Sequence, residues 1–287
     1  MAAQLLEGKP VAEAVLGDLG ERIGKLSAAG KSVGLGTILV GDDPASAGYV
    51  RMKHEACARL GIESFHREVP ASASQADLLA AVDEFNGDHG VDAFLVQNPV
   101  PSGFDFNEAM LRMDPAKDVD GLHPVNLGRL VLQAEGPVPC TPAGILAMLS
   151  HYGIAVAGRE VVVVGRGPTL GRPLSLMLTL KRADANAAVT VVHTGVADIG
   201  AFTRRADVVV AAVGVPGFVT ADMVKPGAVV ISGGITYEGR KVLADVDERV
   251  GEVASWITPR IGGVGPMTIA MLLKNCVEAA ERAGTPA

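Results

Sequence analysis

Four side chains in the first half of the sequence have types suited to moving protons and to holding a polar ring. They are Tyr49, Lys53, Gln97 and Asp120. Tyr49 and Lys53 are four residues apart, so a helix would place both on one face. A lysine beside an apolar helix face more often extends past it into water. Spacing alone therefore leaves both arrangements open.

Gln97 and Asp120 lie where a ligand-facing residue can be expected. Gln97 ends an apolar run that reads as a strand, and in open parallel sheets ligands bind at the carboxyl ends of the strands. Asp120 lies in a turn with Asp118, between Lys117 and Gly121. Two carboxylates in a turn usually belong to a solvated loop, so this turn by itself indicates no specific site.

A glycine-rich segment from Gly165 to Gly171 directly follows the valine run Val161 to Val164. A helix is predicted after it, through Arg172 to Leu178. Glycines let the backbone approach a pyrophosphate, and a helix N-terminus offers unpaired N–H groups and a partial positive charge. The order of strand, glycine turn and helix predicts a dinucleotide site. The alternative is a tight turn in an α/β domain that binds no nucleotide.

The end of the next predicted strand bears on which dinucleotide is bound. An acidic residue there would bind the adenosine ribose and repel a 2′-phosphate. The strand instead ends at His193, Thr194 and Gly195, with no carboxylate before Asp198. Arg166, in the glycine turn, is a candidate partner for a 2′-phosphate. These features favour NADP over NAD, while His193 is equally well explained as a residue that fills the strand end.

These residues are expected on a repeating pattern of strands and helices. Apolar runs at 35–40 and 92–97 read as strands, and helical patterns begin at about Ser46 and cover Gln75 to Phe85. This β-α-β order predicts a parallel sheet. Residues 114–142 are rich in Gly, Pro and Asp, with a short helical interval at 126–132. A second α/β series follows, with a helix from 143 to about 151, strands at 160–165, 189–193, 207–212 and 228–232, and a last helix at 267–283. We expect this helix to stop at Gly284 and to return to the first domain.

The bulk composition limits the class of partner and the compartment. The net charge is −7 and no basic run occurs, which argues against a nucleic-acid partner. Cys57, Cys140 and Cys276 are far apart and lack metal-type spacing, so neither a disulfide framework nor a metal site is expected. The first ten residues lack a signal-peptide pattern, and no apolar stretch is as long as a membrane span. We therefore expect a soluble, cytoplasmic protein without a membrane partner.

Six segments carry a resemblance to one enzyme family. They are GYVRMKHEAC (48–57), VQNPVP (96–101), PAKDVDGLHPVN (115–126), PCTPAG (139–144), GRGPTLGRP (165–173) and GGVGPMT (262–268). In these segments the sequence resembles the bifunctional methylenetetrahydrofolate dehydrogenase/methenyltetrahydrofolate cyclohydrolase family. The segments occur in the family's order and extend over nearly the whole chain.

The resemblance implies a fold and an activity. It implies an α/β protein of two domains, a catalytic folate-binding domain (1–138 plus 267–287) and a Rossmann-like NADP-binding domain (139–266). The implied enzyme oxidises 5,10-methylenetetrahydrofolate with NADP and hydrolyses the methenyl product to 10-formyltetrahydrofolate, in one-carbon metabolism that supplies purine biosynthesis. Tetrahydrofolate derivatives are the implied small-molecule partners, and a homodimer is the implied assembly.

The resemblance also implies roles for individual residues. Lys53 matches the family's catalytic lysine. Desolvation and the contact with Gln97 would lower the pKa of this lysine toward neutrality. Tyr49 would stack on the p-aminobenzoyl ring, and Asp120 would bind the pterin ring. The other implied folate contacts are Val96, Asn98, Gly262, Gly263, Val264, Gly265, Pro266, Met267 and Thr268. The implied cofactor contacts are Thr141, Gly165, Arg166, Gly167, Gly171, Thr194 and Ile235.

Four positions depart from the family pattern. Gly167 replaces a serine, and the segment 194–196 replaces one that often carries serine, arginine and threonine. Both changes remove potential 2′-phosphate contacts and keep NAD possible. Ser232 and Gly233 stand where Asp-Val is usual, and Asn98 stands where leucine is usual. Two other hypotheses remain: a nicotinamide-dependent dehydrogenase of another small substrate, or a non-catalytic relative, against which the intact Lys53 argues.

Overall fold

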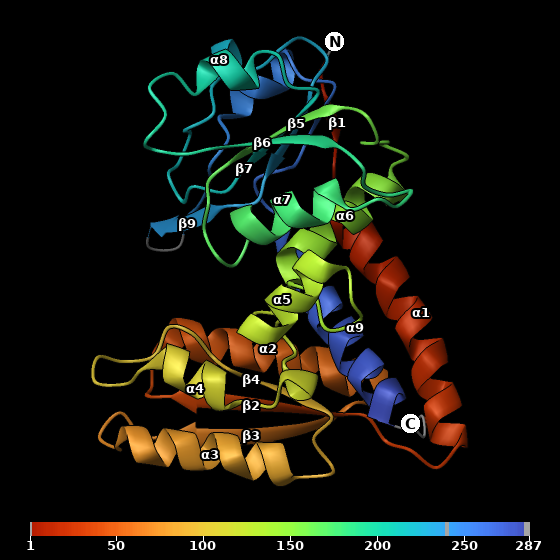
Figure 1. Ribbon diagram of the computed structural model, residues 1–287, viewed down its shortest axis with the longest axis vertical. Coiled ribbons are helices and arrows are strands. Elements are labelled where there is room, and N and C mark those ends of the chain that lie inside the picture. Colours follow the sequence, from red (N-terminus) through yellow and green to blue (C-terminus); the bar gives the residue numbers. More distant parts are fainter. Residues whose placement is uncertain (1, 239–240, 284–287) are drawn as a thin grey trace. The chain divides into compact units, whose positions relative to one another are not determined.

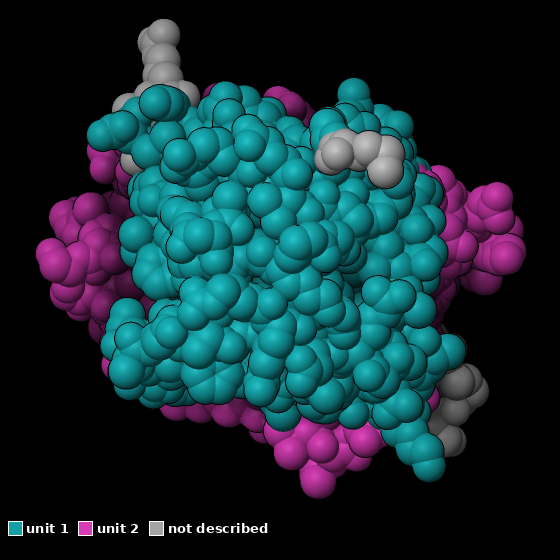
Figure 2. Space-filling view, turned by 90° about the horizontal axis from the view of Figure 1, so that it is seen from above, with its two compact units in different colours: residues 1–13, 139–268 teal, residues 14–138, 269–287 magenta. Residues whose placement is uncertain are grey.

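The chain divides into two compact units in a computed structural model that describes residues 2–238 and 241–283 (Figure 1). Unit 1 comprises residues 1–13 and 139–268, and unit 2 comprises residues 14–138 and 269–287 (Figure 2). These units differ from the expected domain ranges at 1–13, which lie in unit 1 because their strand joins its sheet, and at 267–268, which also group with unit 1. As a division of function, the expected ranges stay a prediction.

Unit 2 is built on a three-stranded parallel sheet in the order β3-β2-β4. The central strand β2 is buried at all seven residues, as expected for a strand covered on both faces. Figure 1 shows α2 and α3 on opposite faces of this sheet. The strands are β2 (Gly34–Val40), β3 (Glu63–Val69) and β4 (Ala93–Val96), and the helices within the unit are α2 (Pro44–Leu60), α3 (Gln75–Gly87), α4 (Phe106–Arg112), η1 (Pro115–Lys117) and α5 (Pro124–Leu132).

Two long helices have most of their residues in unit 2. They are α1 (Gly8–Ala28) and α9 (Gly265–Ala283), and each begins with a few residues that belong to unit 1. Residues 269–283 of α9 group with the N-terminal sheet of unit 2, which confirms the expected return of the last helix. The expected stop at Gly284 lies outside the described residues.

Unit 1 is built on a six-stranded sheet in the order β1-β11-β8-β7-β5-β6, in which every neighbouring pair is parallel. Its strands are β1 (Gln4–Leu5), β5 (Glu160–Val164), β6 (Ala188–Val192), β7 (Val208–Ala211), β8 (Val229–Ser232) and β11 (Trp256–Ile257). Its other elements are α6 (Cys140–His151), α7 (Gly171–Thr179), α8 (Gly200–Thr203), η2 (Ala221–Met223), η3 (Glu248–Glu252) and the antiparallel pair β9 (Ile235–Glu238) and β10 (Lys241–Ala244). The two parallel α/β units confirm the fold class expected from the sequence.

Local capping residues set where the helices of unit 2 begin. The side chain of Asp43 accepts a hydrogen bond from the backbone N–H of Ser46 at 2.8 Å, and Pro44 occupies the first turn of α2. This helix ends at Leu60 and is followed by Gly61, whose φ of 74° lies in the left-handed region that favours glycine. Asp43 and Gly61 thus bound α2, the helix that carries Tyr49 and Lys53.

Some elements were not expected from the sequence. Strand β3 lies between the two predicted strands in the chain, but it is an edge strand whose residues are mostly exposed, so it shows no apolar run. Helix α1 buries Val11, Leu19 and Ile23, while three glycines interrupt its pattern. No helix among the described residues has the length and apolar character needed to cross a membrane.

Candidate active site

Lys53 and Gln97 meet in the interior of unit 2. Lys53 lies on α2, Gln97 directly follows β4, and each residue is only 8% exposed. The Nζ atom of Lys53 donates to Oε1 of Gln97 at 3.0 Å. The contact expected between these two residues is therefore present, joining a helix to the end of a neighbouring strand.

The Gln97 amide is held on both sides. Its Nε2 donates to the carbonyl of Asn98 at 2.8 Å, so Oε1 is the atom turned toward the ammonium group. The backbone N–H of Gln97 donates to the Ile38 carbonyl at 2.8 Å, which ties the residue to the central strand. An amine held by a fixed, buried carboxamide can exchange protons with a bound molecule while keeping its position.

Tyr49 lies one helical turn before Lys53 on α2 and is 36% exposed. Residues four apart share a helix face, so the tyrosine ring lies on the same side of α2 as the lysine. An aromatic ring with part of its surface exposed can stack on a flat ligand ring. This arrangement supports the expected role of Tyr49 as a ring contact.

Asp120 is half-buried in the loop between η1 and α5. Burial raises the pKa of its carboxyl group, the charge of Lys53 lowers it, and the charge of Asp118 raises it. The effect of Lys53 shows that the carboxyl group and the ammonium group lie within electrostatic reach of each other. Tyr49, Lys53, Gln97 and Asp120 thus lie in one unit and form one candidate site.

Asp118 was not proposed as a site residue, but it organises the loop that carries Asp120. It is 1% exposed and accepts hydrogen bonds from the backbone N–H groups of Gly121 (3.0 Å) and His123 (2.8 Å). Nδ2 of Asn126 also donates to it at 2.9 Å. The pairing of two acidic residues in one turn was the available signal, because one of them can bind the backbone of the loop, as Asp118 does.

The other expected folate contacts are divided between the units. In unit 2, Val96 is buried in the sheet core and Asn98 is exposed. The segment 262–268 lies in unit 1, where Val264 and Met267 are buried. Because these two side chains are buried, the expected contacts of the segment fall to its backbone and its smaller residues.

The glycine turn of unit 1 is as closely packed as a pyrophosphate site requires. Gly165 follows β5 with φ of 123°, and a Cβ there would lie 2.1 Å from the carbonyl oxygen of Ala212. A Cβ on Gly171, at the start of α7, would lie 2.3 Å from the carbonyl oxygen of Gly165. Only glycine fits at either position, so the backbone of the turn approaches the N-terminus of α7. This cradle fits a dinucleotide.

Arg166 extends from this turn toward the end of β6. Its NH1 group lies 3.2 Å from Nε2 of His193, whose Nδ1 accepts a hydrogen bond from the backbone N–H of Gly195 at 3.1 Å. The nearest following carboxylate, Asp198, is paired with Arg204 at 3.1 Å. The exposed guanidinium group, with an imidazole ring next to it, is a candidate site for an anionic group.

The remaining expected cofactor contacts lie in the same unit. Thr141 lies on α6, and its Oγ1 is 3.1 Å from Oγ1 of Thr268 on α9. A Cβ added at Gly167 would meet no other atom within 4 Å, and Thr194 is exposed. Ile235 begins β9, but its side chain lies outside the described part of the structure.

Ser232 has a structural explanation. Its Oγ donates to the Gly234 carbonyl at 3.1 Å and accepts from the backbone N–H of Asp245 at 3.0 Å. Its own N–H donates to Oγ1 of Thr258 at 2.8 Å. The side chain at this departure from the family pattern therefore joins the ends of β8 and β10.

Comparison with known proteins identifies what the chain is similar to. The model of the tetrahydrofolate dehydrogenase/cyclohydrolase catalytic domain matches residues 6–120, and the NAD(P)-binding domain of the same family matches residues 139–284. The bifunctional protein FolD of Syntrophotalea carbinolica is 69% identical over 281 residues, which cover 98% of this chain and 97% of that protein.

Solved structures agree with this similarity. The bifunctional enzyme FolD of Campylobacter jejuni superimposes with a TM-score of 0.94 at 40% identity, covering 98% of this chain and all of that one. The Trypanosoma brucei methylenetetrahydrofolate dehydrogenase-cyclohydrolase, solved in complex with NADP and an inhibitor, gives a TM-score of 0.92 at 35% identity and covers both chains completely.

Proposed function

This chain belongs to the tetrahydrofolate dehydrogenase/cyclohydrolase family, and from this premise we propose how its own residues carry out two reactions. The enzyme oxidises 5,10-methylenetetrahydrofolate to 5,10-methenyltetrahydrofolate with NADP, and it hydrolyses that product to 10-formyltetrahydrofolate. The observation that supports the assignment of residues is the buried contact of 3.0 Å between Lys53 and Gln97.

Unit 2 holds the folate. Tyr49 stacks on the p-aminobenzoyl ring, and the Asp120 carboxylate accepts hydrogen bonds from the amino and ring N–H groups of the pterin. By the family resemblance, the segment 262–268 adds further folate contacts. These interactions orient the bridging methylene carbon, and orientation of bound reactants is the main contribution that a protein makes to such a transfer.

Unit 1 holds the cofactor. The turn from Gly165 to Gly171 receives the pyrophosphate at the N-terminus of α7, and Arg166 binds the 2′-phosphate. When bound, NADP accepts the hydride that leaves the methylene carbon. Thr141, Thr194 and Ile235 complete the proposed cofactor contacts, and Gly167 allows the backbone to approach closely.

The hydrolysis needs a group that moves protons. As the water oxygen bonds to the methenyl carbon, neutral Lys53 takes a proton from the water. The bond from that carbon to the ring nitrogen N5 then breaks, N5 takes up a proton, and the hydroxyl proton leaves as the formyl carbonyl forms. One proton is released overall. Gln97 keeps the amine in place and forms a hydrogen bond with the oxygen atom that comes from water.

The experiment follows both activities together with purified protein. Methylenetetrahydrofolate is supplied with NADP or NAD, and formation of the reduced cofactor is recorded together with formation and decay of the methenyl compound. We expect both to form and the methenyl compound then to decay. Folded protein that forms neither product would instead favour a dehydrogenase of another substrate or a non-catalytic relative.

We also propose that the enzyme is a homodimer in the cytoplasm, where its product serves purine biosynthesis. Strand β6 supports the assembly, because it ends the sheet of unit 1 and three of its five residues are half-buried. An edge strand presents backbone groups that can pair with a second copy. Light scattering should give twice the mass of the chain, and the mass of a single chain would exclude the dimer.

A further inference from the structure

The loop that carries Asp120 needs support from outside itself. It lies between the end of η1 at Lys117 and the start of α5 at Pro124, so it is not itself part of a regular helix or strand. A loop side chain keeps a precise position only where its backbone is hydrogen-bonded to rigid elements. Asp118 bonds the loop to its own following residues, which sets its shape.

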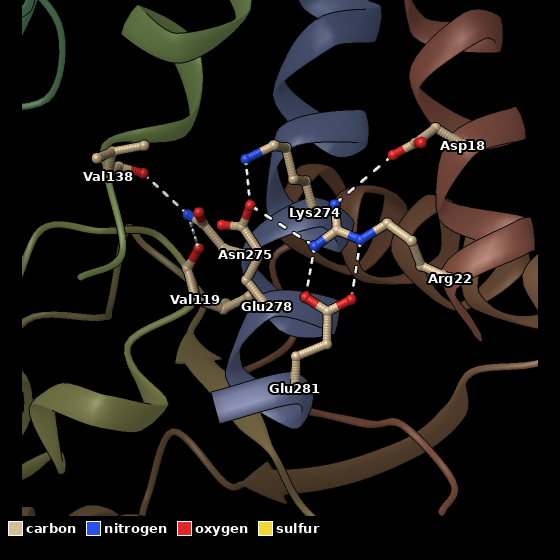
Figure 3. Close-up of polar contacts among 8 residues, drawn as sticks. All are labelled: Asp18, Arg22, Val119, Val138, Lys274, Asn275, Glu278 and Glu281. Atoms are coloured by element: carbon tan, nitrogen blue, oxygen red, sulfur yellow. Dashed lines mark hydrogen bonds and ion pairs between the residues drawn. The ribbon is translucent and has the colours of Figure 1, made fainter. Parts of the chain in front are cut away.

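Asn275 provides support from a distant part of the chain. This residue lies on α9 and is 3% exposed. Its Nδ2 group donates to the carbonyl oxygens of Val119 and Val138, each at 2.9 Å (Figure 3). An amide nitrogen carries two hydrogens, so each carbonyl receives one.

The Val119 carbonyl belongs to the peptide group whose nitrogen is that of Asp120. Fixing this oxygen therefore fixes the peptide plane from which the Asp120 side chain extends. Val119 is itself fully buried, and its N–H donates to the Phe94 carbonyl on β4 at 3.3 Å. The residue before Asp120 is thus held by a strand on its N–H side and by α9 on its carbonyl side.

Helix α9 is a rigid anchor in this part of unit 2. Arg22 on α1 donates to both carboxylate oxygens of Glu281 at 2.9 and 2.6 Å (Figure 3). Arg22 also lies 3.7 Å from Glu278, which in turn pairs with Lys274, the residue preceding Asn275. Bidentate pairs joined in a network restrict the movement of a helix more than a single exposed pair does.

We propose that Asn275 is a positioning residue for folate binding, which acts by orienting the peptide group before Asp120. This inference rests on the proposed role of Asp120 in binding the pterin. The alternative is that Asn275 only satisfies two buried carbonyl groups and contributes to stability. A purely structural role predicts a loss of stability without a selective effect on the folate.

The test compares Asn275→Ala with Arg22→Met in the full-length protein, below the melting temperature of every variant. Both substitutions weaken the attachment of α9, but only the first removes the bond to Val119. For Asn275→Ala we expect the KM for methylenetetrahydrofolate to rise about tenfold, with the KM for NADP changed less than twofold. For Arg22→Met we expect a lower melting temperature and both KM values within twofold of those of the wild type.

Two further variants complete the test. In an Asp120→Ala background, loss of Asn275 should raise the folate KM no further, because Asn275 acts through Asp120. Should Asn275→Ala not fold, Asn275→Leu keeps about the size of the side chain, removes the N–H donors without burying a charge and should give the same selective effect.

Three outcomes would overturn the inference: equal effects of the Asn275 and Arg22 variants on the folate KM, a parallel rise of both KM values, or an undiminished effect in the Asp120→Ala background. If Asp120→Ala itself leaves the folate KM unchanged, it is the proposed role of Asp120 that fails.

Discussion

The charges of Lys53 and Asp120 depend on each other. Burial disfavours the charged form of the Asp120 carboxyl group, while Lys53 favours it. Lys53 is at the same time held by the neutral carboxamide of Gln97. One amine therefore serves two proposed purposes: in its neutral form it takes a proton from water, and in its charged form it keeps the pterin-binding group ionised.

The first prediction concerns Lys53 as the proton carrier. Lys53→Met should lower the cyclohydrolase rate by about a hundredfold or more, the range expected for loss of a general acid–base group. The rate of methenyl decay measures this effect, with circular dichroism as the check on folding. Arg51→Met, which removes an exposed cation from the same helix, should leave the rate unchanged. Retained hydrolysis in the Lys53 variant would refute the assigned role.

The second prediction concerns pH. Asp120 accepts hydrogen bonds best as a carboxylate, so folate binding should weaken as the pH falls through the pKa of Asp120. Lys53 lowers that pKa, and its removal should raise it. In Lys53→Met the midpoint of the loss of binding should therefore move to higher pH, as measured by titration calorimetry with a folate analogue. A shift to lower pH, or none, would contradict the coupling.

The third prediction concerns the choice of cofactor. Arg166→Ala should raise the KM for NADP about tenfold, which corresponds to about 1.4 kcal/mol, with little change in the KM for NAD. Arg182→Ala is the control, because Arg182 is half-exposed, lies in the same unit and pairs with Asp184. A parallel rise for both cofactors would show that Arg166 does not bind the 2′-phosphate.

At the scale of elements, the short distance between the end of β5 and the start of α7 determines which residues fit in the proposed cofactor turn. Both glycines at the contact are required by the neighbouring backbone, since a side chain on either would overlap a carbonyl group. A strand followed closely by a helix N-terminus places N–H groups where a phosphate can bind. The spacing between these two elements is therefore part of the proposed cofactor site.

The fourth prediction tests that spacing. In Gly171→Ala the new Cβ would lie 2.3 Å from the Gly165 carbonyl oxygen, so the start of α7 has to move away. We expect NADP affinity to fall at least tenfold and the melting temperature to drop. Gly20→Ala, in α1 with no atoms near its added Cβ, should instead be neutral or stabilise by about 0.5–1 kcal/mol. Unchanged NADP affinity in Gly171→Ala would contradict the importance of the contact.

At the scale of the whole molecule, each unit has its own parallel sheet and its own apolar core. Each unit also carries a distinct part of the proposed chemistry. Helix α9 is hydrogen-bonded both to α1 and to the loop that carries Asp120, and both contacts lie in unit 2. The helix therefore links the stability of unit 2 to the proposed folate site. The overall charge of −7 implies that anionic ligands depend on local cations such as Arg166.

The fifth prediction concerns the pH dependence of stability. Arg22 lowers the pKa of Glu281 below its ordinary 4.5, so their pairing stabilises the fold above that pH and is lost as the pH falls through the lowered pKa. Arg22→Met should lower the free energy of unfolding by about 1 kcal/mol at neutral pH, because the pair is partly exposed. This difference should disappear in acid. Lys9→Met, which breaks an exposed pair with Glu13, should have a smaller effect at any pH. Equal differences at neutral and acid pH would exclude Glu281 as the partner.

Much of the fold was predictable because fully buried strands consist of continuous runs of apolar residues. The valine run of β5 and the apolar run of β2 are covered on both faces, so burial selects apolar side chains throughout. Strand β3 was missed because an edge strand keeps polar residues such as His66 and Arg67 on exposed positions. The glycine-interrupted pattern of α1 was missed for a similar reason, since only part of one face is buried.

By itself the sequence determined the family, the two α/β series, the glycine turn and the types of the proposed catalytic residues, because each depends on residues close together in the chain. Only the tertiary structure decided which distant groups meet. Asn275 lies 156 residues from Val119, and Arg22 lies 259 residues from Glu281. No local pattern encodes such a pairing, since an asparagine on a helix offers the same donors whatever faces it. Such pairs form on folding, because a polar group that loses its hydrogen bonds to water on burial needs a hydrogen-bond partner within the protein.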